Sequence, residues 1–263
     1  MFSSAPCCSY CGKQPATLKR CSVCKHASYC GAECQNAGWR QHKKTCAPPL
    51  PLDDVVEKVK AAHVARDWRG VLELEGRMEE MMGGRPDATC STILKLFITA
   101  HSGLGHSGVD ARDHLLSAAR LMERRIGLLG RMERFRDQGQ VICAFGINLV
   151  LLGREEDAAK QFERARAVGA AHGFFSLEAN SCLGLGQLAM QKGRDEEGVE
   201  LLQNALVAGR LAEDEDINLE LAALSALVPA LIVTNAIDEA EPLLPRLREA
   251  AKEDSQEGPF QPH

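Results

Sequence analysis

The sequence predicts a mostly α-helical chain in two parts, a small cysteine-rich module at the N-terminus and an all-α solenoid of about five helix pairs after it. Eight of the eleven cysteines lie in the first 46 residues. Beyond residue 52, apolar residues recur three and four positions apart, as they do on one face of an amphipathic helix. Aromatic residues make up only 5% of the chain, which favours packed helices because strands prefer aromatic and β-branched residues.

The cysteine-rich segment has the spacing of metal ligands. Its donors form four pairs, which are Cys8 and Cys11, Cys21 and Cys24, Cys30 and Cys34, and His42 and Cys46. The first two pairs have the Cys-x2-Cys spacing of a ligand turn, and the last two are four residues apart, which puts both donors on one helix face. Zinc prefers four nitrogen or sulfur donors in a tetrahedron, so eight donors predict two closed, structural sites. Spacing alone leaves the combination of the pairs open, and Cys7 could replace Cys8.

Residues 8–46 resemble a MYND-type zinc finger at all eight donor positions, and Tyr29 and the segment 39–42 fit the family as well. The resemblance implies a cross-braced pairing of the donors. One zinc would be held by Cys8, Cys11, Cys30 and Cys34, and the other by Cys21, Cys24, His42 and Cys46. A ubiquitin-ligase-like RING finger is the alternative cross-braced module, but the ligand order and the short interval between Cys24 and Cys30 favour the MYND type.

The same resemblance implies a protein-binding module whose shallow groove accepts short proline-containing peptides. The matching positions are Ser22, Gln35 and Trp39. An exposed tryptophan beside a glutamine amide suits a proline-rich ligand, because such ligands stack on aromatic rings at a low entropic cost.

Prolines at 48, 49 and 51 separate the two parts, because they block helix continuation and stiffen the chain. We therefore expect a tail at 1–7, the finger at 8–46, a proline-rich linker at 47–52, the helical repeats at 53–251 and a flexible tail at 252–263.

The solenoid prediction depends on an internal repeat. Seven positions recur 40 residues apart, the first copy being Phe145, Gly146, Leu149, Gly153, Ala158, Phe162 and Ala165 and the second Leu185, Gly186, Ala189, Gly193, Gly198, Leu202 and Ala205. A third copy follows 42 residues later, from Leu227 to Leu247, and weaker copies precede residue 130. Repeats of this length indicate stacked supersecondary units.

Each repeat reads as a pair of helices. A bulky residue followed by a small one lets the partner helix approach closely, and Gly153, Gly193 and Asn235 end the first helix because that position favours a left-handed backbone. Acidic residues then open the second helix, where the helix dipole favours negative charge. The pattern resembles the tetratricopeptide repeat (TPR), which implies a right-handed solenoid with a concave face that binds a peptide or partner protein.

Composition and charge exclude several classes. The longest apolar stretch, 221–233, is shorter than the roughly 20 residues that a membrane-spanning helix needs, and the N-terminus has no secretory signal. We expect a soluble intracellular protein, cytoplasmic or nuclear or both, whose clustered cysteines bind metal in a reducing compartment. Residues 1–46 carry seven basic residues and one acid, so the net charge of this segment is +6 and that of the remainder is −11. We interpret the segment as mildly basic, which is not a strong indication of a nucleic-acid-binding surface.

The sequence Gly103-Leu-Gly105-His-Ser-Gly108 satisfies a dinucleotide-binding motif. That site needs a strand before the glycines, a crossover helix and a second strand, whereas the surrounding pattern is helical, so we interpret these glycines as a turn between helices. His101, His106 and His114 surround this turn, but no thiolate or carboxylate cluster supports a metal site there.

The sequence thus predicts a non-enzymatic adaptor, with a proline-containing peptide on the finger and a second protein on the helical repeats. The alternative is a relative of protein-lysine methyltransferases that insert a MYND finger into a SET domain. No SET half precedes residue 8, and no strand-rich stretch follows residue 51.

Overall fold

The computed structural model describes residues 7–15, 17–24, 27–44, 46, 52–83, 85–106, 110–212 and 219–256. Most of both predicted tails, the proline-rich linker up to residue 51 and the acidic run 213–216 lie outside these residues. The chain divides into two compact units, Met1–Glu57 and Lys58–His263. The exact domain boundaries expected from the sequence stay predictions.

The first unit contains a two-stranded antiparallel sheet and one helix. Strand β1 (Lys19–Arg20) pairs with β2 (Ser28–Tyr29), with Lys19 opposite Tyr29 and Arg20 opposite Ser28. Helix α1 (Ala32–His42) follows directly. The buried cluster of this unit consists of Cys8, Cys21, Cys24 and Tyr29. A unit with so little apolar core depends on metal for its stability.

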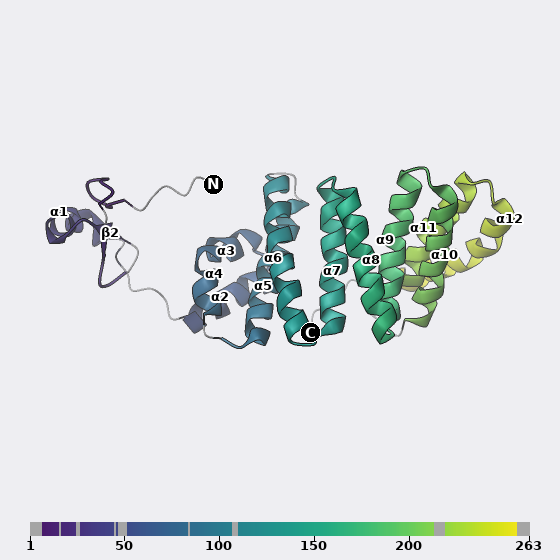
Figure 1. Ribbon diagram of the computed structural model, residues 1–263, viewed down its shortest axis with the longest axis horizontal. Coiled ribbons are helices and arrows are strands. Elements are labelled where there is room, and N and C mark those ends of the chain that lie inside the picture. The colour runs from purple at the N-terminus through teal and green to yellow at the C-terminus, as the bar shows by residue number, and fades with distance from the viewer. Residues whose placement is uncertain are drawn as a thin grey trace. The chain divides into compact units, whose positions relative to one another are not determined.

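The second unit is a stack of helix pairs (Figure 1). The first pair is α2 (Leu52–Val64) with the short segments α3 (Trp68–Glu73), η1 (Glu75–Arg77) and α4 (Met78–Met82). Three long pairs follow, namely α5 (Asp87–Gly105) with α6 (Ala111–Arg131), α7 (Phe135–Leu151) with α8 (Glu155–His172), and α9 (Phe175–Gln191) with α10 (Asp195–Leu211). The last comprises α11 (Leu219–Val233), α12 (Ile237–Ala240), η2 (Glu241–Leu243) and α13 (Leu244–Gln256). The prediction of a mostly α fold with about five helix pairs is confirmed.

Neighbouring helices pack in sequence order, as expected for a solenoid. Each long pair packs internally, and α6, α8 and α10 also pack on the first helix of the following pair. The first helices α7, α9 and α11 contact one another in succession. The buried face of each helix therefore continues into the next repeat, which is how a repeat too small to bury its apolar face alone becomes stable.

The predicted turn chemistry is confirmed. Gly153, Gly193 and Asn235 have φ values of 72°, 69° and 60°, the left-handed region that glycine and asparagine tolerate best. The acidic residues expected at the start of the second helix occupy the first turns of α8, α10 and α12.

The glycine motif lies at the end of a helix. Gly103 and Gly105 belong to α5, and Gly108 lies outside the described residues. Because a helix precedes these glycines, the structure gives the dinucleotide interpretation no support. Instead the glycines permit close packing: a Cβ at Gly103 would lie 2.8 Å from Trp68 Nε1, and one at Gly105 would lie 2.8 Å from Leu115 Cδ2.

The last repeat departs from the pattern. Its second helix is divided into α12, η2 and α13, because Pro242 and Pro245 each lack the N–H that a continuous helix would need there. Among the described residues, no helix is both long and apolar enough to cross a membrane.

Candidate metal centre

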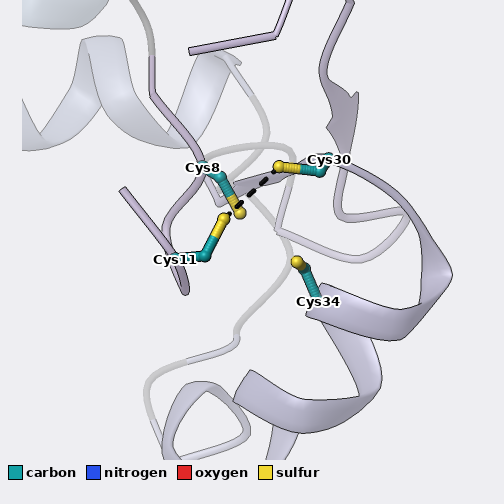
Figure 2. A group of neighbouring side chains, drawn as sticks. All are labelled: Cys8, Cys11, Cys30 and Cys34. Carbon is teal, nitrogen blue, oxygen red and sulfur yellow. Dashed lines mark hydrogen bonds between the residues drawn. The ribbon is translucent and has the colours of Figure 1, made fainter. Parts of the chain in front are cut away.

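Four thiols of the first unit converge on one point (Figure 2). The Sγ atoms of Cys8, Cys11, Cys30 and Cys34 all lie within 4.8 Å of one another, and those of Cys11 and Cys30 are 3.5 Å apart. Cys8 and Cys11 belong to a tight turn closed by the hydrogen bond from Gly12 N to Cys8 O, and Gly12 has a φ of 71°. The structure places Cys8 in this cluster, whereas Cys7 is an exposed free thiol.

A second cluster consists of Cys21, Cys24, His42 and Cys46, whose donor atoms also lie within 4.8 Å of one another. The Sγ atoms of Cys21 and Cys46 are 3.8 Å apart, and His42 Nε2 is 3.5 Å from Cys24 Sγ. Cys21 and Cys24 flank the turn after β1, and His42 is the last residue of α1.

The two clusters use the four pairs alternately along the chain. The first and third pairs form one cluster, and the second and fourth form the other. This is the cross-braced grouping that the MYND resemblance implies and that spacing alone left open. The small sheet and α1 hold these distant pairs together.

The donor sets fit zinc. Donors about 2.3 Å from a tetrahedral zinc lie roughly 3.8 Å from one another, which agrees with the sulfur–sulfur distances of 3.5 and 3.8 Å. With eight donors divided into two complete sets of four, the ions are structural. The two clusters are therefore consistent with the two structural zinc ions predicted from the sequence.

The pKa values of the thiols also favour a bound cation in each cluster. The backbone N–H of Cys11 lowers the pKa of Cys8 to about 6. The hydrogen bond with the Cys11 side chain, helped by burial, raises the pKa of Cys30 to about 12. In the second cluster, burial and the Cys21 thiol raise the pKa of Cys46 to about 11. One thiolate thus makes the next harder to form, and a bound divalent cation removes that cost because it favours every thiolate at once.

The three predicted groove residues lie in and near α1. Gln35 and Trp39 are one turn apart on the same face, and the Trp39 side chain is 42% exposed. Its ring also makes an edge contact with the ring of His42, at a centroid distance of 5.7 Å. Ser22 is exposed and lies in the turn between Cys21 and Cys24. The assignment of these residues to a peptide groove stays a prediction.

A hollow on the opposite face of α1 was not anticipated from the sequence. It encloses about 700 Å³ and is lined by Tyr10, Tyr29, Gly38, Gln41 and Lys44, among others. A Cβ at Gly38 would lie 3.3 Å from Tyr10 Cδ2. Because Ala37 and Gln41 lie about half a helical turn from Trp39, this hollow is distinct from the predicted groove.

The histidines near the glycine motif form a hydrogen-bonded chain. His101 Nδ1 is 3.0 Å from His114 Nδ1, and His101 Nε2 is 3.1 Å from the Glu75 carboxylate. The two His101 contacts use opposite ring nitrogens, and the two cysteine-containing clusters are the groups of three or more metal donors found among the described residues.

Two cross-braced four-donor clusters followed by a stack of paired helices define a zinc-finger protein with a helical-repeat domain. Residues 8–46 match the family model of the MYND finger. The helical part has the TPR-like fold of solved repeat proteins.

Similarity in sequence is confined to short segments. The chain is 46% identical over 39 residues to SET domain-containing protein 14 of Caenorhabditis elegans, which is 15% of this chain and 9% of that protein. It is 44% identical over 41 residues to human N-lysine methyltransferase SMYD2, covering 16% of this chain and 10% of the relative. The chain thus spans about a tenth of the length of these relatives.

Similarity in structure covers most of the chain. A Podosopora anserina kinesin light chain protein with nearly identical TPR-like repeats aligns with a TM-score of 0.54 at 17% identity, covering 77% of this chain and 96% of that one. BtubC (BKLC) from P. vanneervenii aligns with a TM-score of 0.61 at 12% identity, covering 88% and 90%. At these identities the likeness shows the fold alone.

Proposed function

We propose that this chain is a non-enzymatic adaptor that holds two protein partners, a proline-containing peptide on the MYND finger and a second protein on the helical repeats. The observation that carries the proposal is the combination of two interaction modules on one chain. Two weak sites that engage one complex gain avidity without any new contact. The mechanism is tethering.

On the finger, we assign peptide binding to the face of α1 that carries Gln35 and Trp39. An exposed indole supplies the flat apolar surface on which proline rings stack, and a glutamine amide can donate to and accept from a peptide backbone. Because Trp39 contacts the ring of His42, the zinc cluster also orients the binding face.

On the repeats, the contiguous first helices α7, α9 and α11 offer a surface for the second partner. Apart from Arg136 near the start of α7, their exposed positions are uncharged and mix apolar with polar side chains, for example Gln140, Ala144, Ile147, Leu151, Gln187, Gln191, Ser225, Pro229 and Val233. Covering these uncharged positions desolvates no charge, so a protein or extended peptide can bury them at low cost.

The compartment follows from the same chemistry. Thiol clusters that bind structural zinc persist in a reducing environment, so we assign the chain to the cytoplasm, the nucleus or both. The finger has a mildly basic charge and few aromatic residues, which favours protein over nucleic acid as its partner.

Neither alternative function has a specific observation in its favour. The similarity to SMYD2 covers 16% of this chain, and residues 52–256, where described, form helices and turns with no strand, whereas the SET domain of that alternative is strand-rich. The alternating clusters occur in RING fingers too, but residues 8–46 match the MYND model.

The test uses the zinc-loaded full chain and an array of eight-residue peptides, each proline-containing sequence being paired with its Pro→Ala version. We expect peptide binding that depends on the proline and that falls at least tenfold in the Trp39→Ala variant. Native mass spectrometry should show that this variant still contains two zinc ions per chain. Tyr10→Ala is the matched control, because Tyr10 is an exposed aromatic residue that lines the hollow on the other face of α1. Unchanged binding by Trp39→Ala, or loss only in Tyr10→Ala, would refute the assigned face.

A further inference from the structure

A groove runs between the second helices α8 and α10, with α9 as its floor. It encloses about 620 Å³. Phe175 of α9 and Val207 and Leu211 of α10 line it and are 41%, 59% and 52% exposed. Ala167 and Ala170 of α8 leave the opposite wall shallow. Glu163 and Arg166 of α8, which form an ion pair with each other, also line this wall. The groove is therefore mostly apolar, open to solvent and on the side of α9 opposite to Gln187.

One carboxylate lines this groove without a cationic partner. Glu178 of α9 is half-buried, and α8 passes so close to it that a Cβ at Gly169 would lie 2.9 Å from Glu178 Cγ. The neighbouring guanidinium, that of Arg166, pairs with Glu163 at 2.8 Å. Across the described ranges, no lysine or arginine forms an ion pair with Glu178.

The last repeat contains a carboxylate at the same position, but there it is neutralised. Glu220 on α11 is the equivalent of Glu178, 42 residues later. Two arginines bind it, Arg210 of α10 at 2.9 Å and Arg246 of α13 at 2.6 Å. The same site in the fold is thus neutralised from both sides in the last repeat.

Both of those arginines are replaced in the groove. The residue 40 positions before Arg210 is Ala170, and the residue 42 positions before Arg246 is Asn204. Ala170 and Asn204 line the groove together with Glu178. The groove therefore lies where the last repeat places two guanidinium groups. It also contains Glu178, the carboxylate that such groups would bind.

We propose that this groove binds an arginine side chain of a partner segment in which apolar residues flank the arginine. A guanidinium can form two parallel hydrogen bonds with the Glu178 carboxylate, and the Asn204 amide oxygen can accept another. Phe175 offers an aromatic face to the cation, and Val207 and Leu211 cover the apolar neighbours. Lysine lacks the planar fork and fits less well.

Charge along the sequence favours the same partner. Residues 213–216, which lie outside the described part of the chain, are four consecutive acids beginning two positions after Leu211. The groove is a site separate from the first-helix surface proposed above, so the inference adds a second binding site to the repeat domain and rests on the proposed adaptor function.

The experiment pans the zinc-loaded full chain against a phage-displayed library of random twelve-residue peptides. We expect enrichment of peptides with arginine beside leucine, isoleucine, valine or phenylalanine. The strongest of these is then synthesised, labelled and titrated by fluorescence anisotropy. Changing its arginine to glutamine weakens binding at least tenfold, and changing it to lysine weakens binding by a smaller factor.

Variants of the protein locate the site. Glu178→Gln weakens binding at least tenfold, whereas Glu156→Gln, an exposed carboxylate of α8 outside the groove, leaves it unchanged. Asn204→Arg and Ala170→Arg restore the cation of the last repeat within the chain, so each raises the melting temperature and blocks the peptide. A peptide whose binding is insensitive to Glu178→Gln and to both arginine variants overturns the proposal, as does a selection without arginine.

Failure of the groove and failure of the adaptor are distinguishable. Trp39→Ala leaves groove binding intact, because Trp39 belongs to the finger. If the selected peptides depend on Trp39 alone, the proposed arginine-binding groove is refuted and the proposed function of the finger is supported. A selection that yields no specific peptide for either module overturns both.

Discussion

Gly186 of α9 and Gly198 of α10 pack backbone against backbone. A Cβ at Gly186 would lie 3.1 Å from the carbonyl oxygen of Gly198, and a Cβ at Gly198 would lie 3.2 Å from that of Gly186. In this repeat the bulky-then-small signature thus marks a close helix crossing, where an added Cβ would be crowded by the facing backbone. Gly146 has the same role in the preceding repeat, where an added Cβ would lie 2.7 Å from Phe162 Cε1.

Gly186→Ala should therefore destabilise the repeat domain. Alanine is ordinarily the better helix former, but the Cβ would also lie 2.8 Å from Leu202 Cγ, and overpacking of this kind costs about 1–3 kcal/mol. Gly127→Ala is the matched control, since no atom lies within 4 Å of its Cβ position on α6, and it should stabilise by about 0.5–1 kcal/mol. Urea unfolding monitored by helical circular dichroism at constant zinc measures both. Equal effects of the two variants would contradict the close crossing.

Removing zinc should unfold the finger and spare the repeats. The buried cluster of the finger consists of metal-binding cysteines and Tyr29, whereas the repeats have a large aliphatic core of their own. We expect a strong chelator to release two zinc ions per chain, to abolish proline-dependent peptide binding and to leave most of the helical signal. The release is counted with a colorimetric zinc indicator. A loss of helix in proportion to zinc would show that the two units are not independent.

His114→Ala should destabilise the second helix pair. His101 lies between the Glu75 carboxylate, which accepts from Nε2, and His114 Nδ1, which is hydrogen-bonded to His101 Nδ1. Without His114, the Nδ1 of buried His101 loses its hydrogen-bond partner, which costs about 1–3 kcal/mol. His114→Asn restores a polar partner and should recover part of the loss. His106→Ala, at an exposed position, should change stability by less than about 0.5 kcal/mol. Denaturant midpoints of the three variants are compared at pH 7.5. Equal effects of His106→Ala and His114→Ala would contradict a stabilising hydrogen bond between His101 and His114.

Acid should weaken the last repeat through Glu220. Hydrogen bonds from Arg246 and then Arg210 hold the pKa of Glu220 below its usual value. A carboxylate with a lowered folded-state pKa stabilises the protein above its unfolded-state pKa, and this stabilisation is lost as the pH falls through the folded-state pKa. Glu220→Gln should therefore cost about 1–2 kcal/mol at pH 7 and little at pH 3.

The control for that measurement is Glu197→Gln. Glu197 forms an ion pair with Arg194, and both side chains are 50% exposed. Such exposed pairs contribute about 0–1 kcal/mol, so the variant should follow the wild type closely. Melting temperatures from pH 3 to pH 7 test this difference. A Glu220→Gln curve parallel to the wild-type curve would show that the two arginines do not stabilise the ionised carboxylate.

Much of the helical domain could be predicted because its determinants are local. The glycine and asparagine turns and the acidic first turns depend on residues within a few positions of each other. The broken second helix of the last repeat was missed, although Pro242 and Pro245 signalled it, because the repeat pattern was extended through them. The groove was also missed, since Ala170, Glu178 and Asn204 are unremarkable until three helices bring them together.

By itself, the sequence predicted seven of the eight zinc donors, with Cys7 and Cys8 as alternatives for the eighth, and it determined the repeat length and the positions of the turns, because each is encoded in spacing along one segment. Only the tertiary structure decided which donor pairs share a cluster, that His101 meets His114, and that Glu178 lacks the arginines that Glu220 possesses. These relationships join residues that are 10 to 26 positions apart. Their physical basis is packing between helices and turns, which brings together side chains whose separation along the chain carries no signal of contact.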